Sequence, residues 1–174
     1  MKKLLAICLL VLGNNLFTET DLQKAVRSGD LKQVKELLVV MVNPHKYVNP
    51  NKYDSLISPL RLAVRLPESN PDKQEIIRSL VNAGVDVNRL ETVEEFLTAE
   101  GFPFRCPAIN TVLHEAVLKS DPVTVKTLLE LGANPKKNDN GGITPLRLVF
   151  NSCYTPNINP EIKEMLKPFF SSWI

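Results

Sequence analysis

The two histidines and three cysteines of this sequence are the side chains that most readily act as nucleophiles, bases or metal ligands. His45 lies in a segment rich in Asn and Pro, with no cysteine or carboxylate cluster at ligand spacing. Cys106 and His114 are eight residues apart across the start of an expected helix, so the two side chains could approach each other. Because nothing else supports a nucleophile–base pair, we interpret His114 as a structural, partly buried histidine.

The longer motifs of catalysis are missing as well. The sequence contains no P-loop, no glycine-rich dinucleotide motif, no H-E-x-x-H and no C-x-x-C. The formal net charge is +2, and Lys and Arg are scattered along the chain, which does not indicate nucleic-acid binding. We therefore expect a protein that is not an enzyme, uses no metal or cofactor and binds no nucleic acid. An enzyme with an unrecognised site is the remote alternative.

An acidic group stands in the segment between residues 89 and 109. It consists of Glu91, Glu94, Glu95 and Glu100. We interpret these carboxylates as the solvated face of a helix, with a cation site as the alternative. Cys106 and Cys153 match no motif spacing, so two separate thiols are favoured over a disulfide, although an exported protein could form one.

The chain begins like an export signal. Lys2 and Lys3 precede nine apolar residues at 4–12, a run too short to cross a bilayer as an ordinary helix. We interpret residues 1–18 as a signal peptide, with Gly13 as the best cleavage point, and expect an exported protein, periplasmic or secreted. The alternatives are an uncleaved membrane anchor and an apolar leader that packs on the domain. Contact with a membrane is expected only through this leader.

A repeated pattern organises the remaining residues. Four stretches align from a starting Thr or Ser: TDLQKAV at 20–26, SPLRLAV at 58–64, TVLHEAV at 111–117 and TPLRLVF at 144–150. A second apolar segment follows each one: LKQVKELL at 31–38, QEIIRSLVNAG at 74–84, VTVKTLLELGA at 123–133 and EIKEMLKPFF at 161–170. Apolar residues recur at helical spacing in both members of each pair. The sequence thus predicts four helix–turn–helix units.

Local chemistry supports these helices. Ser58 and Thr144 can cap a helix, and a proline stands directly after each of them, where its missing N–H does no harm. Gly84 and Gly132 follow the second helices, where a left-handed residue is favoured. The residues of this structural motif are Ser58, Pro59, Gly84, Thr111, His114, Gly132, Thr144 and Pro145.

A unit of about 33 residues with a T-P-L-H-x-A start and a G-A-D/N-x-N end resembles the ankyrin repeat. The third unit carries the pattern best, with TVLHEAV followed by LLELGANPKKND. The resemblance implies an all-α ankyrin-repeat solenoid with projecting hairpin loops over residues 19–174. Its repeats are placed at about 19–54, 55–109, 110–140 and 141–174.

The units depart from the ankyrin pattern in two ways. In the family, the motif histidine makes structural hydrogen bonds, but here it is present only as His114. We place Lys24, Arg61 and Arg147 at its position in the other units and expect weaker bonding between repeats there. The insertions in the first and second units are expected to fall in the hairpin loops and not in the helices.

The resemblance implies that the protein binds another protein through a concave surface of loop tips and first helices. The residues expected to contact a partner are Tyr47, Tyr53, Arg89, Phe102, Phe104, Arg105, Lys136 and Lys137. The partner is either a protein of the same compartment or, if the chain is a secreted effector, a host protein.

Apolar side chains gather in the long insertion and at the end of the chain. The insertion contains Phe96, Leu97, Phe102 and Phe104, which either form a small core of their own or anchor a partner. The chain ends with Phe169, Phe170, Trp173 and Ile174. Some of these must close the last repeat, and any remainder would leave an apolar contact patch.

Overall fold

The computed structural model describes residues 20–40, 57–93, 108–151, 155 and 157–170. These ranges contain α2 (Asp21–Ser28), α3 (Leu31–Val40), α4 (Pro59–Arg65), α5 (Lys73–Asn82), β1 (Glu91–Val93), β2 (Ala108–Asn110), α6 (Val112–Leu118), α7 (Pro122–Glu130), α8 (Pro145–Phe150) and α9 (Pro160–Phe170). The leader at 1–18 lies outside the described residues. Within them, none of the helices has the length and apolar character needed to cross a membrane.

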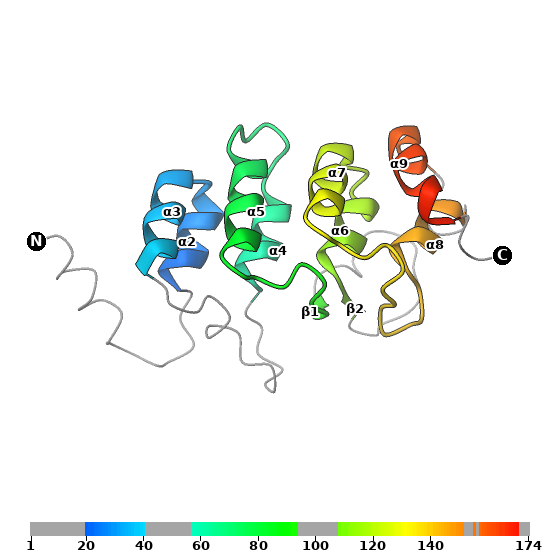
Figure 1. The fold of residues 1–174 in the computed structure, drawn as a ribbon, viewed down its shortest axis with the longest axis horizontal. Helices are drawn as coiled ribbons and strands as arrows, with labels where there is room; N and C mark the ends of the chain where they lie inside the picture. Colours follow the sequence, from blue (N-terminus) through cyan, green and yellow to red (C-terminus); the bar gives the residue numbers. More distant parts are fainter. Residues whose placement is uncertain (1–19, 41–56, 94–107, 152–154, 156, 171–174) are drawn as a thin grey trace, which may run out of the picture.

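The helices stack in four pairs along one axis (Figure 1). We call α2, α4, α6 and α8 the inner helices and α3, α5, α7 and α9 the outer helices. Each inner helix packs on the outer helix that follows it, and neighbouring helices of each layer pack on one another along the stack. The inner helices lie toward the side from which β1 and β2 project (Figure 1). This arrangement confirms the all-α repeat solenoid expected from the sequence.

Side-chain caps start the inner helices. The Ser58 and Thr144 hydroxyls accept hydrogen bonds from the backbone N–H groups three residues later, and Pro59 and Pro145 occupy the first helical positions. Thr20 caps α2 in the same way, and its own backbone N–H donates a reciprocal hydrogen bond to the side-chain oxygen of Gln23. Such caps satisfy N–H groups that have no partner within the helix.

Left-handed residues reverse the chain between helices. Gly84 and Gly132 have φ of 96° and 86° and follow α5 and α7. Gly29, with φ of 71°, ends α2, and a Cβ at this position would collide with the side chain of Asn70 in the next repeat. The left-handed backbone therefore favours glycine at position 29, and a larger residue would also have to displace the tip of the Asn70 side chain.

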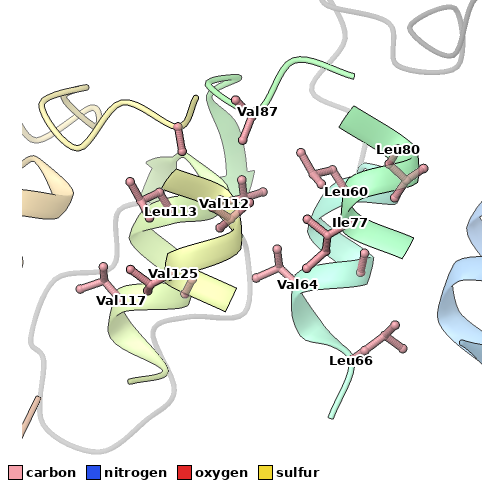
Figure 2. Close-up of a cluster of buried hydrophobic side chains, with 14 of the residues drawn as sticks. Leu60, Val64, Leu66, Ile77, Leu80, Val87, Val112, Leu113, Val117 and Val125 are labelled. Atoms are coloured by element: carbon pink, nitrogen blue, oxygen red, sulfur yellow. The ribbon is translucent and has the colours of Figure 1, made fainter. Parts of the chain in front are cut away.

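One apolar core runs through the stack, because every repeat buries side chains against the next. At the junction of the second and third repeats it includes Leu60, Val64, Ile77, Leu80, Val87, Val112, Leu113, Val117 and Val125 (Figure 2). These side chains come from both layers and from the connecting turns. A repeat stack is stabilised mainly by such contacts between neighbours.

The antiparallel pair of β1 and β2 begins the third repeat's hairpin. Glu91 lies opposite Asn110, and Val93 lies opposite Ala108. The segment expected to be an insertion, residues 89–109, therefore contributes short strands at both of its ends. Residues 94–107 join the two strands and lie outside the described residues.

Candidate partner-binding surface

Three of the residues expected to contact a partner lie in two neighbouring turns. Arg89 is half-buried in the turn after α5, while Lys136 and Lys137 lie in the corresponding turn after α7, where Lys137 is exposed. The side chain of Asn88 joins the two turns, because its amide N–H donates to the Gly132 carbonyl at 3.0 Å and its oxygen accepts from the backbone N–H of Asn134 at 2.7 Å. The structure thus holds these positions side by side.

The other expected contacts fall in parts of the chain that are not described. They are Tyr47, Tyr53, Phe102, Phe104 and Arg105. Cys106 and Cys153, together with Phe96 and Leu97 of the apolar insertion, also lie outside the described residues. Across the described ranges, no group of three or more His, Cys, Asp or Glu side chains could hold a metal ion.

The fourth position of the repeat motif links consecutive repeats. In the first repeat Gln23 donates from Nε2 to the Ile57 carbonyl at 2.7 Å. In the second, Arg61 donates from Nη2 to the Asn110 carbonyl at 2.7 Å. In the third, Nε2 of His114 lies 3.1 Å from the Ile143 carbonyl. Each of these carbonyls belongs to the residue directly before the cap of the next inner helix.

Two expectations are corrected by this pattern. The motif position in the first repeat is Gln23, three residues after the Thr20 cap, and Lys24 is an exposed neighbour that pairs with Asp21. Bonding between repeats is not weaker where histidine is replaced, since Gln23 and Arg61 both reach the equivalent carbonyl. A long side chain with an N–H at its tip is sufficient for this bond.

His114 uses both ring nitrogens inside the core. Nδ1 accepts from the Thr111 backbone N–H at 3.2 Å and lies 2.8 Å from the Thr111 hydroxyl. Nδ1 is therefore unprotonated, and Nε2 carries the hydrogen that it donates to Ile143. Burial lowers the pKa of His114 and outweighs the opposing effect of the Ile143 carbonyl, so the ring is neutral near pH 7. This is a structural role.

A buried ion-pair network at Arg61 was not anticipated from the sequence. The guanidinium is fully buried and donates to the Glu115 carboxylate at 2.7 Å, to the Asn110 side chain at 2.9 Å and to Glu91 at 3.2 Å. Glu115 is also fully buried and accepts a bond from Arg65 at 2.7 Å. The network joins α4 to α6 and to the base of the β1–β2 hairpin, so it fixes the hairpin's direction relative to the helices.

Glu91 does not lie on a helical face, as expected for the acidic group. It lies on β1, where its Oε2 accepts from the Ser58 backbone N–H at 3.3 Å as well as from Arg61. The predicted helical face was wrong for Glu91, because the four glutamates were assigned to one helix whereas the first belongs to a strand. Glu94, Glu95 and Glu100 lie outside the described residues.

A second buried pair joins the outer helices. Nζ of Lys73, at the start of α5, lies 2.8 Å from the carboxylate of Asp121, which caps α7. Burial acts to raise the pKa of Asp121, but hydrogen bonds from Lys73 and Thr124 outweigh it and hold the pKa below its usual value. The second and third repeats are therefore joined by ion pairs in both layers.

Aromatic side chains end the stack. α9 buries Ile162 and Leu166, while Phe169 and Phe170 at its end remain exposed. The rings of Phe170 and Phe150 contact each other, with centroids 5.0 Å apart. Trp173 and Ile174 lie outside the described residues. The last repeat is thus closed by Ile162 and Leu166, which precede the apolar tail, whereas Phe169 and Phe170, the described part of the tail, remain at the surface.

The stacked helix pairs, the projecting hairpin and the bonds between equivalent positions define a helical repeat protein. A sequence model of the ankyrin repeat family matches residues 110–140, which contain α6, α7 and the start of the following turn. Human SH3 and multiple ankyrin repeat domains protein 2 is 31% identical over 133 residues, which is 75% of this chain and 6% of that protein. The chain is an ankyrin repeat protein. Ankyrin repeats are typically non-catalytic and suggest a module for protein–protein interaction.

Proposed function

We propose that the protein is an exported, non-catalytic module that holds a partner protein against its hairpin turns and inner helices. The observation that carries the proposal is the fixed placement of neighbouring turns. Asn88 joins the turn of Arg89 to the turn of Lys136 and Lys137, and the Arg61 network fixes the strands beside them. A preorganised surface loses little conformational entropy when it binds.

Alanine substitution of the turn lysines tests the surface. Lys136→Ala combined with Lys137→Ala removes two side chains at the turn and leaves its backbone bonds to Asn134 in place. Wild-type and variant chains are immobilised and used to capture proteins from the chain's own compartment. We expect the turn variant to lose most of a partner that the wild type retains.

A matched control keeps this test specific. Lys32 and Lys163 are exposed on the outer helices α3 and α9, and the double Lys→Ala change at these positions removes the same charge. This control should retain the partner, and circular dichroism should show equal helicity for all three proteins. Equal capture by the turn variant and the wild type would contradict the proposed surface.

Export is tested by fractionation followed by sequencing of the mature N-terminus. We propose that Lys2, Lys3 and the apolar run at 4–12 direct the chain out of the cell and are then removed, with cleavage near Gly13. A mature chain that begins after this run in the exported fraction supports the proposal. A chain that begins at Met1 in the cytoplasm would contradict it.

A further inference from the structure

The hairpin between the third and fourth repeats contains the one Asn–Gly step of the sequence, at Asn140 and Gly141. Both residues are exposed. They occupy the centre of a β-turn that begins at Asp139, whose carbonyl accepts from the Gly142 backbone N–H at 3.3 Å. Because glycine has no Cβ, its backbone nitrogen is open to the carbonyl carbon of the preceding asparagine side chain. An asparagine before glycine can therefore cyclise onto its own backbone with little steric hindrance.

The Asn140 side chain is held by the neighbouring hairpin. The turn projects on the same side of the stack as β1 and β2 (Figure 1). Oδ1 of Asn140 accepts from the backbone N–H of Ile109, on β2, at 3.1 Å, and the Asn140 backbone N–H donates to the Ile109 carbonyl at 3.1 Å. The Ile109 N–H thus points at the oxygen that becomes negative when a nucleophile attacks the side-chain amide. A fixed donor at this place polarises the carbonyl and stabilises the oxyanion.

The nucleophile of such a reaction is held by the turn itself. The backbone N–H of Gly141 donates to Oδ1 of Asp139 at 2.8 Å. The same oxygen accepts from the Ile143 backbone N–H at 2.8 Å, so the carboxylate is fixed within the turn. A carboxylate in hydrogen-bond contact with the proton of a nucleophile is positioned as a general base. Nucleophile, base and oxyanion donor therefore surround one asparagine.

We propose that this turn is a site of intramolecular modification, at which Asn140 is converted to aspartate and isoaspartate. The Gly141 nitrogen forms a bond to Cγ of Asn140 and gives its proton to the Asp139 carboxylate. The bond from Cγ to Nδ2 then breaks, and Nδ2 takes the proton from Asp139 and leaves as ammonia. Water opens the resulting five-membered imide at either of its carbonyls. The whole conversion consumes one water and needs no other reactant.

The products change the turn in charge and in shape. Each replaces a neutral amide by a carboxylate, three residues from the exposed Lys137. Isoaspartate also adds one atom to the main chain inside the turn, which disturbs the bonds that Gly141 and Gly142 make to Asp139. The inference is independent of the proposed partner surface, because the reaction involves only this turn, the Ile109 N–H and water.

Peptide mapping of the full chain tests the proposal. The protein is incubated at pH 7.5 and 37 °C and digested with trypsin, which cleaves after Lys137 and Arg147 and releases residues 138–147. Mass spectrometry measures the loss of the amide, and chromatography separates aspartate from isoaspartate. The reference is a synthetic peptide of residues 138–147, which lacks the Ile109 donor and the fixed turn. Asn140 should convert at least as fast in the folded chain as in the free peptide, and slower conversion in the folded chain would overturn the proposal.

Neighbouring asparagines are internal controls. Asn138 is exposed and lies in the same tryptic peptide, but Asp139 follows it. Asn134 precedes Pro135, whose nitrogen carries no proton to give up. Conversion should therefore be confined to Asn140. Equal conversion of Asn138 and Asn140 would show that exposure alone decides the rate, and the assigned geometry would be wrong.

Variants of the turn test the assigned roles. Asp139→Asn keeps an oxygen that can accept both N–H groups but removes the base, so it should slow conversion of Asn140 about tenfold, or about 1.4 kcal/mol in activation free energy. Gly141→Ala is a second variant in case the first alters folding. Its Cβ would lie 3.3 Å from Oδ1 of Asp139, which requires only a small shift, and its added bulk should also slow the reaction. Circular dichroism checks that each variant is folded. An unchanged rate in a folded variant would overturn the proposal.

Discussion

The buried network between the second and third repeats gives the sharpest prediction about stability. The perturbation is the replacement of Arg61 by Met, of Glu115 by Met, and of both together. Both side chains are fully buried, and their direct hydrogen bond is 2.7 Å long. Methionine is apolar, unbranched and flexible, so it can fill the vacated space without introducing a new polar group.

The magnitude follows from what each variant leaves behind. Removing one member of a buried ion pair typically costs about 3–5 kcal/mol, because the other charge stays in the interior. Glu115→Met is the costlier change, since Arg61, Arg65 and Lys119 all lose their shared carboxylate. Arg61→Met leaves Glu115 with two cations. The double variant leaves neither charge of the pair buried alone. Its loss of unfolding free energy should therefore be well below the sum of the losses in the two single variants, with a coupling energy of at least about 1 kcal/mol.

The assay is urea unfolding followed by circular dichroism, with thermal unfolding as a second reading. Each single variant should lower the midpoint temperature by roughly 10 °C, as expected for a few kcal/mol in a domain of this size. Arg78→Met is the matched control, because its pair with Glu130 across the outer helices is exposed and should contribute little. Small, additive effects of the Arg61 and Glu115 changes would refute the interpretation of the network.

Three further predictions concern single side chains. His114→Gln copies the residue at the same position in the first repeat. Because the folded pKa of His114 lies below the unfolded value of about 6.5, the wild type should lose stability relative to this variant as the pH falls below 6.5. Urea unfolding of both proteins at pH 7.5 and 5.5 measures this difference. The folded pKa of Asp121 is also lowered, so the stability that this carboxylate provides is present above its unfolded pKa of about 3.9 and is lost as the pH falls through the folded pKa. Asp121→Asn should therefore destabilise the protein at pH 7 and much less near pH 3. Leu128→Ala should cost about 2–5 kcal/mol by opening a cavity, whereas exposed Val123→Ala should leave the urea midpoint nearly unchanged.

The helices could be predicted because their signals are local. A helix cap and the first helical residue are adjacent in sequence at Ser58 and Pro59, and again at Thr144 and Pro145. The recurrence of a starting Thr or Ser followed by two apolar segments in four units made the architecture predictable as well, since each repeat needs a neighbour to bury its apolar face.

The network at Arg61 could not be predicted in the same way. Its partners Glu91, Asn110 and Glu115 lie 30, 49 and 54 residues away, and no local pattern joins them. A usable signal existed in the aligned repeats: Arg61 occupies the histidine position of one unit, and Glu115 occupies the adjacent position of the next. The alternation of a cation and a carboxylate at facing positions suggests a bond between repeats once the stacking order is assumed.

The expected binding residues were placed only in part. Arg89, Lys136 and Lys137 lie in turns that the sequence marks with Gly, Asn and Asp.

Capture of a partner by matched variants tests the central claim most directly. The wild-type chain, the turn variant Lys136→Ala/Lys137→Ala and the outer-helix control Lys32→Ala/Lys163→Ala are compared in the same extract at equal concentration. If the chain is an interaction module that binds through its turns, the wild type and the control retain the same partner and the turn variant loses it. Equal retention by all three folded proteins would contradict the account.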